Sequence, residues 1–566
     1  MTTTTQAPTN APATARWIVG PAQDLLLFLC TPVLILPAIL LLQQRFASAA
    51  ISTAVMAFGA MGHHLPGMLR AYGDRALFRR YRTRFVVAPV ILVTLCVAFA
   101  LRGSSGMLLI AYLWGVWHGW MQTYGFARIY DAKVGSFGPR VARWDFGLCA
   151  TWFVAGVVVA DTRLFYLLRM AGEFGFAAPG ADAVAALRVG VIATLIAVTL
   201  GYAANLLALQ RAGRRVNPLK LLLLATSFGW WWYANVAVAD ILIGLILFEI
   251  FHDVQYLSIV WLFNRGRVDR DPDVGGFTRF VFRRSWGLVG LYVAMVFAYG
   301  GLGPLAEHWV TSPTAISIAT ALVTASTLLH FYYDGFLWKV REVTTRQSLG
   351  IDAGREAQAA PLVTRHALIW LLLLVPVTIL WTTSHGRADR DSIDEARRLA
   401  ASCPRSAEAL VTLGTALGDA GDHDGSVTAF ERALALVPDH PRARVNLVTS
   451  CYQAGRAALA AGRGDDARRL LGLAGAERPE LAQHETAEGY GLWQARKLED
   501  AILHLRTAVL LDPRFPPGQL NLALALRDHG DPRAALQHAE IGAGLLPDDA
   551  KARQLVAELR RLVEGR

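Results

Sequence analysis

The sequence predicts an all-α protein in two parts: a polytopic bundle of about eleven transmembrane helices, followed by an α-solenoid of helical repeats. Three observations support this class. Apolar runs of roughly 16–26 residues recur between Leu25 and Trp381, long enough for membrane helices. After Arg387 the chain becomes polar, with helical periodicity. Within that second part, prolines recur at a nearly constant interval, as in a repeat array.

Composition supports this division of the chain. Of the 566 residues, 54% are hydrophobic and only 17% are charged. We predict a disordered, Thr- and Pro-rich N-terminus at residues 1–16, a transmembrane domain at 17–385 and a repeat domain at 386–566. The net charge of +11 is spread over short loops between apolar runs. Membrane orientation explains such loops, so we expect no nucleic-acid partner.

The predicted spans follow from hydropathy along the chain. The first apolar run lacks the basic segment of a cleavable signal peptide, so we interpret it as a membrane helix. The eleven predicted spans are residues 25–42, 47–66, 85–101, 106–126, 146–160, 186–209, 219–235, 238–263, 286–302, 314–338 and 366–382.

The loops between these spans predict the orientation. Alternate loops hold 25 Lys and Arg on one side against 4 on the other. Because cytoplasmic loops carry the excess of basic residues, we expect a cytoplasmic N-terminus. An odd number of spans then places the repeats outside the cytoplasm. In a Gram-negative cell, this would be an inner-membrane protein with periplasmic repeats.

The repeat domain carries a recognisable pattern. Its prolines are Pro404, Pro438, Pro479, Pro513 and Pro547, spaced by 34, 41, 34 and 34 residues. Small residues precede them at recurring positions, such as Gly414 and Gly489. The pattern resembles the tetratricopeptide repeat, with seven extra residues lengthening one helix around 443–461. That resemblance implies a groove for a protein or peptide partner.

The predicted membrane part contains polar groups that hydrocarbon tolerates poorly. They occur in four stretches, "GHHLPGMLRAYGD", "WHGWMQTYG", "FEIFHDVQY" and "LLHFYYDGFLWK". An acidic residue at a helix centre costs roughly 2.5–3.5 kcal/mol on insertion scales. Several stretches space these groups by three or four residues, which places them on one helical face. Their predicted depths share a layer in the cytoplasmic half of the membrane.

We therefore predict a buried transition-metal centre. Imidazole and carboxylate ligands favour iron, with zinc, copper and manganese as alternatives. The charge of the metal would offset the cost of burying the acids. Gln122 is expected to bind or to orient a ligand. The predicted ligands are His63, His64, His118, Glu249, His252, Asp253, His330 and Asp334.

Simpler interpretations exist for the same residues. Asp253 would pair with an arginine such as Arg128, and Asp334 with Lys339. The whole set would then be a proton pathway or a group of interhelical hydrogen bonds.

Histidine motifs on several spans resemble the integral-membrane histidine-motif oxygenases, such as desaturases, hydroxylases and carotene-cleaving dioxygenases. The dense H-x-x-x-H boxes of the desaturases are absent. The resemblance implies an oxidative enzyme whose apolar substrate, a lipid or isoprenoid, diffuses within the membrane.

Two other functions fit the sequence. One is a membrane-anchored assembly or transport protein that recruits its partner through the repeats. The other is a polytopic lipid-linked sugar transferase. Enzymes of that kind share an acidic pair in the first outer loop, whereas "QQRFASAA" contains no acid.

Overall fold

The structure is a computed structural model that describes residues 16–136, 138–269, 274–283, 285–309, 311–337, 362–384 and 393–565. Within these ranges the chain forms helices and no strand, which confirms the all-α class. The chain divides into two compact units, Met1–Arg390 with Arg398–Ser406, and Asp391–Arg397 with Ala407–Arg566. The predicted disordered segment at 1–16 lies outside the described residues except for Arg16.

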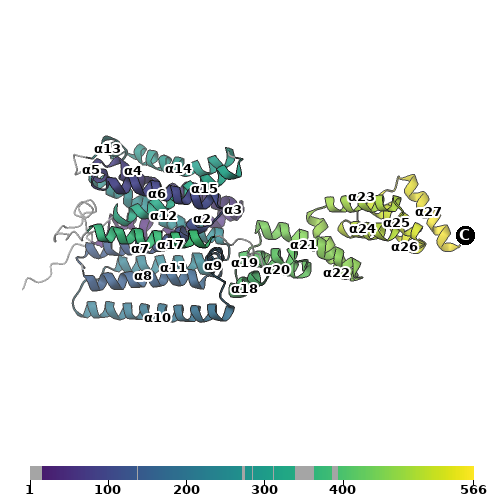
Figure 1. The fold of residues 1–566 in the computed structure, drawn as a ribbon, viewed down its shortest axis with the longest axis horizontal. Helices are drawn as coiled ribbons and strands as arrows, with labels where there is room; N and C mark the ends of the chain where they lie inside the picture. The colour runs from purple at the N-terminus through teal and green to yellow at the C-terminus, as the bar shows by residue number, and fades with distance from the viewer. Residues whose placement is uncertain are drawn as a thin grey trace, which may run out of the picture. The chain divides into compact units, whose positions relative to one another are not determined.

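The first unit is a bundle of long helices with short helical connections (Figure 1). Helix α8 packs against α7 and α10, and α15 packs against α6. The described elements are α1 (Pro21–Asp24), η2 (Leu25–Leu29), α2 (Thr31–Gln43), α3 (Ser48–Val55), η3 (Met56–Ala60), α4 (His64–Gly73), α5 (Arg75–Arg80), α6 (Arg82–Leu101), α7 (Gly106–Lys133), α8 (Pro139–Val159), α9 (Asp161–Gly172), α10 (Ala181–Arg211), α11 (Pro218–Trp232), η4 (Tyr233–Ala237), α12 (Ile241–Val268), α13 (Gly276–Val281), α14 (Trp286–Trp309), α15 (Pro313–Leu337) and α17 (Leu362–Thr383).

The prediction of about eleven spans is wrong when each described helix is judged by its length and mean hydropathy. Among the described residues, five helices could cross a membrane: α6, α8, α10, α12 and α15. A sixth is possible if α1, η2 and α2, bent by 53°, form one span. Helix α7 has 28 residues, but it is not among them. Its His, Gln, Trp and Gly residues lower its mean hydropathy.

Breaks within helices explain why other predicted spans are not single membrane-crossing helices. The predicted span 47–66 is divided into α3, the π-helical turn η3 and the start of α4. The predicted span 219–235 is the 15-residue helix α11 followed by the π-helical turn η4. Hydropathy alone does not detect such breaks, because the residues on both sides of them are apolar.

Apolar clusters fix the helices that carry the predicted ligands. One cluster joins α6, α7, α15 and α17, with Phe85 and Tyr333 fully buried. A second joins η2, α7, α8 and α11 around Phe153 and Trp231. A third joins α2, α3, α11 and α12. Helices α7, α12 and α15 are therefore held by packing on several sides.

The second unit is a row of helix pairs. Helix α18 (Ile393–Ser402) precedes the row. The helices of the row are α19 (Ala407–Asp419), α20 (His423–Leu436), α21 (Pro441–Ala460), α22 (Gly464–Glu477), α23 (Glu480–Gln494), α24 (Leu498–Leu511), α25 (Pro516–His529), α26 (Pro532–Leu545) and α27 (Ala550–Glu564). Helix α21 has 20 residues, which confirms the predicted lengthening.

Small residues allow the paired helices to cross closely. A Cβ atom added at Gly414 would lie 2.8 Å from the Phe430 ring, and one added at Gly489 would lie 2.6 Å from Leu505. Both distances are too short for a real Cβ contact, so a larger residue at either position would force the facing side chain to shift.

Candidate metal centre

Five predicted ligands converge in the first unit. His63 and His64 lie at the start of α4, and His118, His252 and His330 lie in α7, α12 and α15. The His330 ring centroid is 4.6 Å from that of His63 and 4.8 Å from that of His118. All five side chains belong to residues that are at most 7% exposed. Segments up to 267 residues apart thus form one buried imidazole cluster.

The ligand atoms are spaced as one metal site requires. His63 Nε2 and His330 Nε2 are 3.1 Å apart. Asp334 Oδ2 lies 3.6 Å from His330 Nε2 and 3.9 Å from His118 Nε2. Two nitrogens that each lie about 2.1 Å from one ion, at angles of roughly 90–109°, are about 3.0–3.4 Å apart. The observed spacings need only small closing movements.

Two groups of possible ligands share one residue. The first is His63, His252 and His330, and the second is His118, His330 and Asp334. Within each group the ligand atoms lie within 4.8 Å of one another. Because His330 belongs to both groups, we interpret them as two sides of a single site rather than two separate sites.

Several buried polar atoms in this cluster have no hydrogen-bond partner among the described residues. They include His118 Nε2, His330 Nδ1 and Asp253 Oδ2. An unsatisfied buried polar group costs about 1–3 kcal/mol, and more when it is charged. A cation bound between the imidazoles would reduce this cost, so the residues present fit a metal ion.

Asp253 is placed to orient His63. Its Oδ1 atom lies 2.8 Å from His63 Nδ1, at ion-pair distance, although the angle is not that of a hydrogen bond. A small rotation of either side chain would bring the two atoms to hydrogen-bond geometry. With Nδ1 facing the carboxylate, Nε2 faces His330. This is the usual relation of a carboxylate to a metal-bound histidine.

Tyr256 orients the second acid, and the sequence analysis missed it. Its hydroxyl donates a hydrogen bond of 3.0 Å to Asp334 Oδ1, while Oδ2 of the same carboxylate faces His118 and His330. A signal was available, because Tyr256 follows His252 by one helical turn on the same face of α12.

Three predicted ligands, Asp253, His64 and Glu249, stay outside both ligand groups. His64 Nδ1 is hydrogen-bonded to Ser326 Oγ at 3.1 Å, and its ring stacks on His330 at 4.8 Å. Glu249 is half-buried one turn before Asp253 and within electrostatic reach of Asp253, His63 and Arg163. From these positions the side chains would support the ligands of the histidine cluster rather than bind a metal directly.

Close backbone approach explains two glycines beside the site. A Cβ atom added at Gly59 would lie 3.0 Å from Asp253 Oδ2, and one added at Gly67 would lie 3.2 Å from the Tyr256 hydroxyl. Gly59 lies in the π-helical turn η3. Such turns are frequent at functional sites, because they shift side chains out of the regular helical register.

The proposed pairing of Asp253 with Arg128 is wrong. Arg128 instead lies 2.6 Å from Asp131 and 3.2 Å from Asp145. Lys220, which is 1% exposed, binds the same two acids at 3.0 and 2.9 Å. The four charges balance, so this cluster is a satisfied structural network. The other suggested pair involves Lys339, which lies outside the described residues.

In the second unit, polar contacts join the first helices of neighbouring repeats. Tyr452 of α21 donates to Glu485 of α23, and Trp493 of α23 donates to Asp528 of α25 at 3.0 Å. His504 Nδ1 also contacts Glu485, at 2.9 Å. A row of such helices forms the extended binding surface of repeat proteins.

Comparison with known proteins identifies the repeats. A family model described as tetratricopeptide repeat matches residues 411–471 and 486–550. The C-terminal part of the chain therefore carries tetratricopeptide repeats, the basis of a protein-interaction domain. No curated protein matches the chain. The resemblance of the first unit to histidine-motif membrane oxygenases stays a prediction.

Solved structures of repeat proteins are similar to part of the chain. MamA of Desulfovibrio magneticus is 23% identical, covers 28% of this chain and 85% of its own, and has a TM-score of 0.16. A thermophilic TPR protein of Thermus thermophilus is 18% identical, covers 34% and 95%, and has a TM-score of 0.14. With TM-scores this low, neither likeness carries an argument about this chain.

Proposed function

We propose that the first unit is a membrane-embedded metalloenzyme with one transition-metal ion, acting oxidatively on a lipid or isoprenoid. The observation that carries this proposal is the buried convergence of imidazoles from four helical segments around His330, with Asp334 beside them. Structural hydrogen bonding alone does not account for it, because His118 Nε2 and His330 Nδ1 have no hydrogen-bond partner among the described residues.

The residues have distinct roles in this proposal. His63, His118, His252, His330 and Asp334 would hold the metal. A mixed His and carboxylate set favours iron, with zinc, copper or manganese as alternatives. When bound, an iron ion of this kind would supply one-electron and dioxygen chemistry to the site.

The surrounding residues would hold and protect this centre. Asp253 would fix the ring of His63, and Tyr256 would fix the carboxylate of Asp334. Phe331, which is 8% exposed and stacks on His118 at 4.6 Å, would help exclude water. An apolar setting of this kind suits a substrate that arrives from within a membrane.

The repeats have a separate role in the same proposal. We infer that they recruit a protein partner outside the cytoplasm, with the N-terminus of the chain inside. The tetratricopeptide match supports the interaction, and the basic loops support the orientation. The same match also favours a second function, a membrane-anchored assembly or transport protein in which the histidine cluster is a proton path or a packing device.

Metal analysis distinguishes the two functions. Wild-type protein, purified without chelators and resupplied with metal, should contain about one transition-metal ion per chain. His330→Ala should lose most of it, because His330 belongs to both ligand groups. His64→Ala, which changes an equally buried ring outside both groups, should lose much less. His484→Ala, exposed in the repeats, should lose none.

The measurement is elemental analysis of monodisperse samples whose helix content matches that of wild type by circular dichroism. Wild-type protein without stoichiometric transition metal would contradict the enzyme and leave the anchored repeat protein. Equal losses in the His330 and His64 variants would contradict the ligand assignment.

A further inference from the structure

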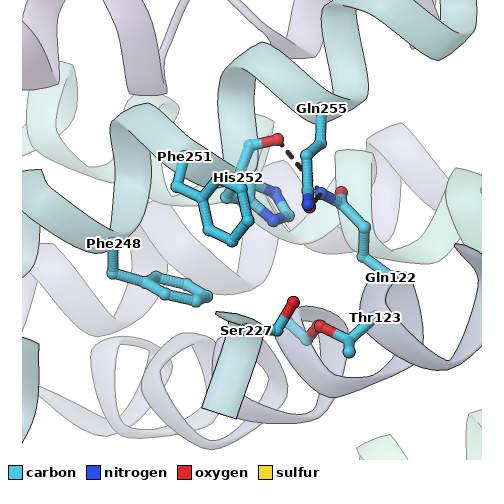
Figure 2. A pocket seen from close by; sticks show the side chains of 8 residues that line it. Gln122, Thr123, Ser227, Phe248, Phe251, His252 and Gln255 are labelled. Carbon is cyan, nitrogen blue, oxygen red and sulfur yellow. Dashed lines mark hydrogen bonds between the residues drawn. The ribbon is translucent and has the colours of Figure 1, made fainter. Parts of the chain in front are cut away.

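A small cavity lies on the α11 side of His252, and it shares no other residue with the two ligand groups. Helix α7 contributes Gln122 to its wall, α11 contributes Ser227, and α12 contributes Phe251 and His252. Figure 2 shows the side chains of Gln122 and Gln255 meeting beside His252, with Ser227 on another wall. Its enclosed space is about that of one water molecule.

A chain of amides fixes the orientation of Gln122. Gln255 Nε2 donates to the Phe28 carbonyl at 2.8 Å, so Gln255 Oε1 is an acceptor. Gln122 Nε2 donates to that oxygen at 3.1 Å and to the His252 carbonyl at 3.0 Å. Since both neighbours are acceptors, the Gln122 amide has only one satisfactory orientation. Its Oε1 atom must therefore find a donor elsewhere.

Two of the residues that line the cavity each have a polar atom with no partner within the described part of the chain. These atoms are Gln122 Oε1 and Ser227 Oγ. The Ser227 residue is only 5% exposed, so bulk solvent does not satisfy its hydroxyl. Gln122 and Ser227 thus line the same small cavity, and each has a polar atom whose hydrogen-bond position is unfilled among the described residues.

We propose that this cavity is a binding site for one water molecule that bridges Gln122 Oε1 and Ser227 Oγ. The water donates to Gln122 and exchanges its second hydrogen bond with the Ser227 hydroxyl. Dioxygen does not fit, because it has no hydrogen to donate to Gln122. A metal cation does not fit either, since two oxygens fall far short of the six or more that hard cations take.

The bound water completes a chain of hydrogen bonds across four elements. The chain runs from the Phe28 carbonyl in η2 through Gln255 in α12 and Gln122 in α7 to Ser227 in α11. Gln122 also holds the His252 carbonyl. The water is therefore a positioning element for the backbone at His252, and its binding does not depend on the proposed metal.

Radiolytic labelling of the full-length protein tests this site. Hydroxyl radicals formed from a bound water label the nearest side chain, and Phe251 is otherwise 3% exposed. After brief mixing with ¹⁸O water, wild-type Phe251 should carry a label with ¹⁶O, because a buried water exchanges slowly. Ser227→Val, which fills the cavity and removes the hydroxyl, should lose the label.

A milder variant and a control variant complete the test. Ser227→Ala removes a single atom and should fold; it should retain less ¹⁶O label than wild type, because one hydrogen bond of the water is lost. Ser258→Val, on α12 but outside the cavity wall, should label like wild type. An unlabelled Phe251 in wild type, a label that exchanges fully to ¹⁸O, or a label unchanged in both Ser227 variants would each overturn the proposal.

Discussion

The two acids nearest the histidine cluster differ in what they contact. Asp253 faces His63 Nδ1, on the side of the ring away from His330. Asp334 presents one oxygen to Tyr256 and the other to His118 and His330. The same residue type therefore serves as an orienting group in one place and as a candidate ligand in the other. Which role each acid takes depends on the neighbouring side chains.

Tyr256→Phe should weaken metal binding while the fold persists. The change removes the hydroxyl that holds Asp334 Oδ1, so the carboxylate loses its fixed orientation. Loss of such a supporting hydrogen bond typically lowers metal affinity by roughly 10–100-fold. Competition with a chelator of known affinity measures the change.

Tyr292→Phe is the matched control for this prediction. Tyr292 is 4% exposed, and its hydroxyl has no hydrogen-bond partner among the described residues. Removing that hydroxyl should leave metal affinity unchanged. Equal affinity of the Tyr256 variant and wild type would show that Asp334 needs no support or is not a ligand.

At the scale of elements, glycines mark where helices approach closely. In the repeats they lie at the crossing of each helix pair, and in the first unit they lie against the acid and tyrosine of the site. The π-helical turn η3 carries one of these glycines, Gly59, four residues before the first of the two adjacent histidines. The approach of η3 and α4 to the Asp253 and Tyr256 side chains of α12 thus depends on residues with no side chain.

Gly489→Ala and Gly491→Ala should have opposite effects on the stability of the repeats. An added Cβ at Gly489 would meet Leu505 at 2.6 Å, and overpacking costs about 1–3 kcal/mol. At Gly491 nothing lies within 4 Å, so replacing a helical glycine should stabilise by roughly 0.5–1 kcal/mol.

Denaturant unfolding of a fragment of residues 391–566 provides the measurement. The fragment should be helical and cooperative, because the second unit has its own apolar clusters. An unfolded fragment would mean that the repeats need the first unit as a cap. A shift of the same sign for both glycine variants would contradict the predicted crossing.

At the scale of the whole molecule, the chain joins two units of different character. Among the described residues, the first contains the five helices that are long and apolar enough to cross a membrane, and the second contains the tetratricopeptide repeats. Each unit has its own core. Chemistry and partner recognition can therefore be changed separately in the proposed function.

Fusion reporters test the predicted orientation. Alkaline phosphatase, which needs an extracytoplasmic location, should be active when fused after Arg566 and inactive when fused after Arg279. The expectation rests on the 25 basic residues in one set of loops against 4 in the other. The reverse pattern would invert the topology and the inferred depth of the histidines.

The sequence by itself determined the features that depend on local pattern. Hydropathy predicted the division into an apolar and a polar part, and the proline period predicted the repeats, including the lengthened helix α21. Polar residues at helical spacing pointed to the stretches that carry the candidate ligands. These signals are local, because each arises from residues within one or two helices.

Only the tertiary structure decided how distant helices meet. It placed His330 between His63 and His118, and it added Tyr256 to the site. It left Asp253, His64 and Glu249 outside the ligand groups. It also assigned Arg128 to Asp131 and Asp145, and reduced the number of candidate spans. The physical reason is that convergence depends on helix crossings and breaks, which depend on packing between segments far apart in the chain.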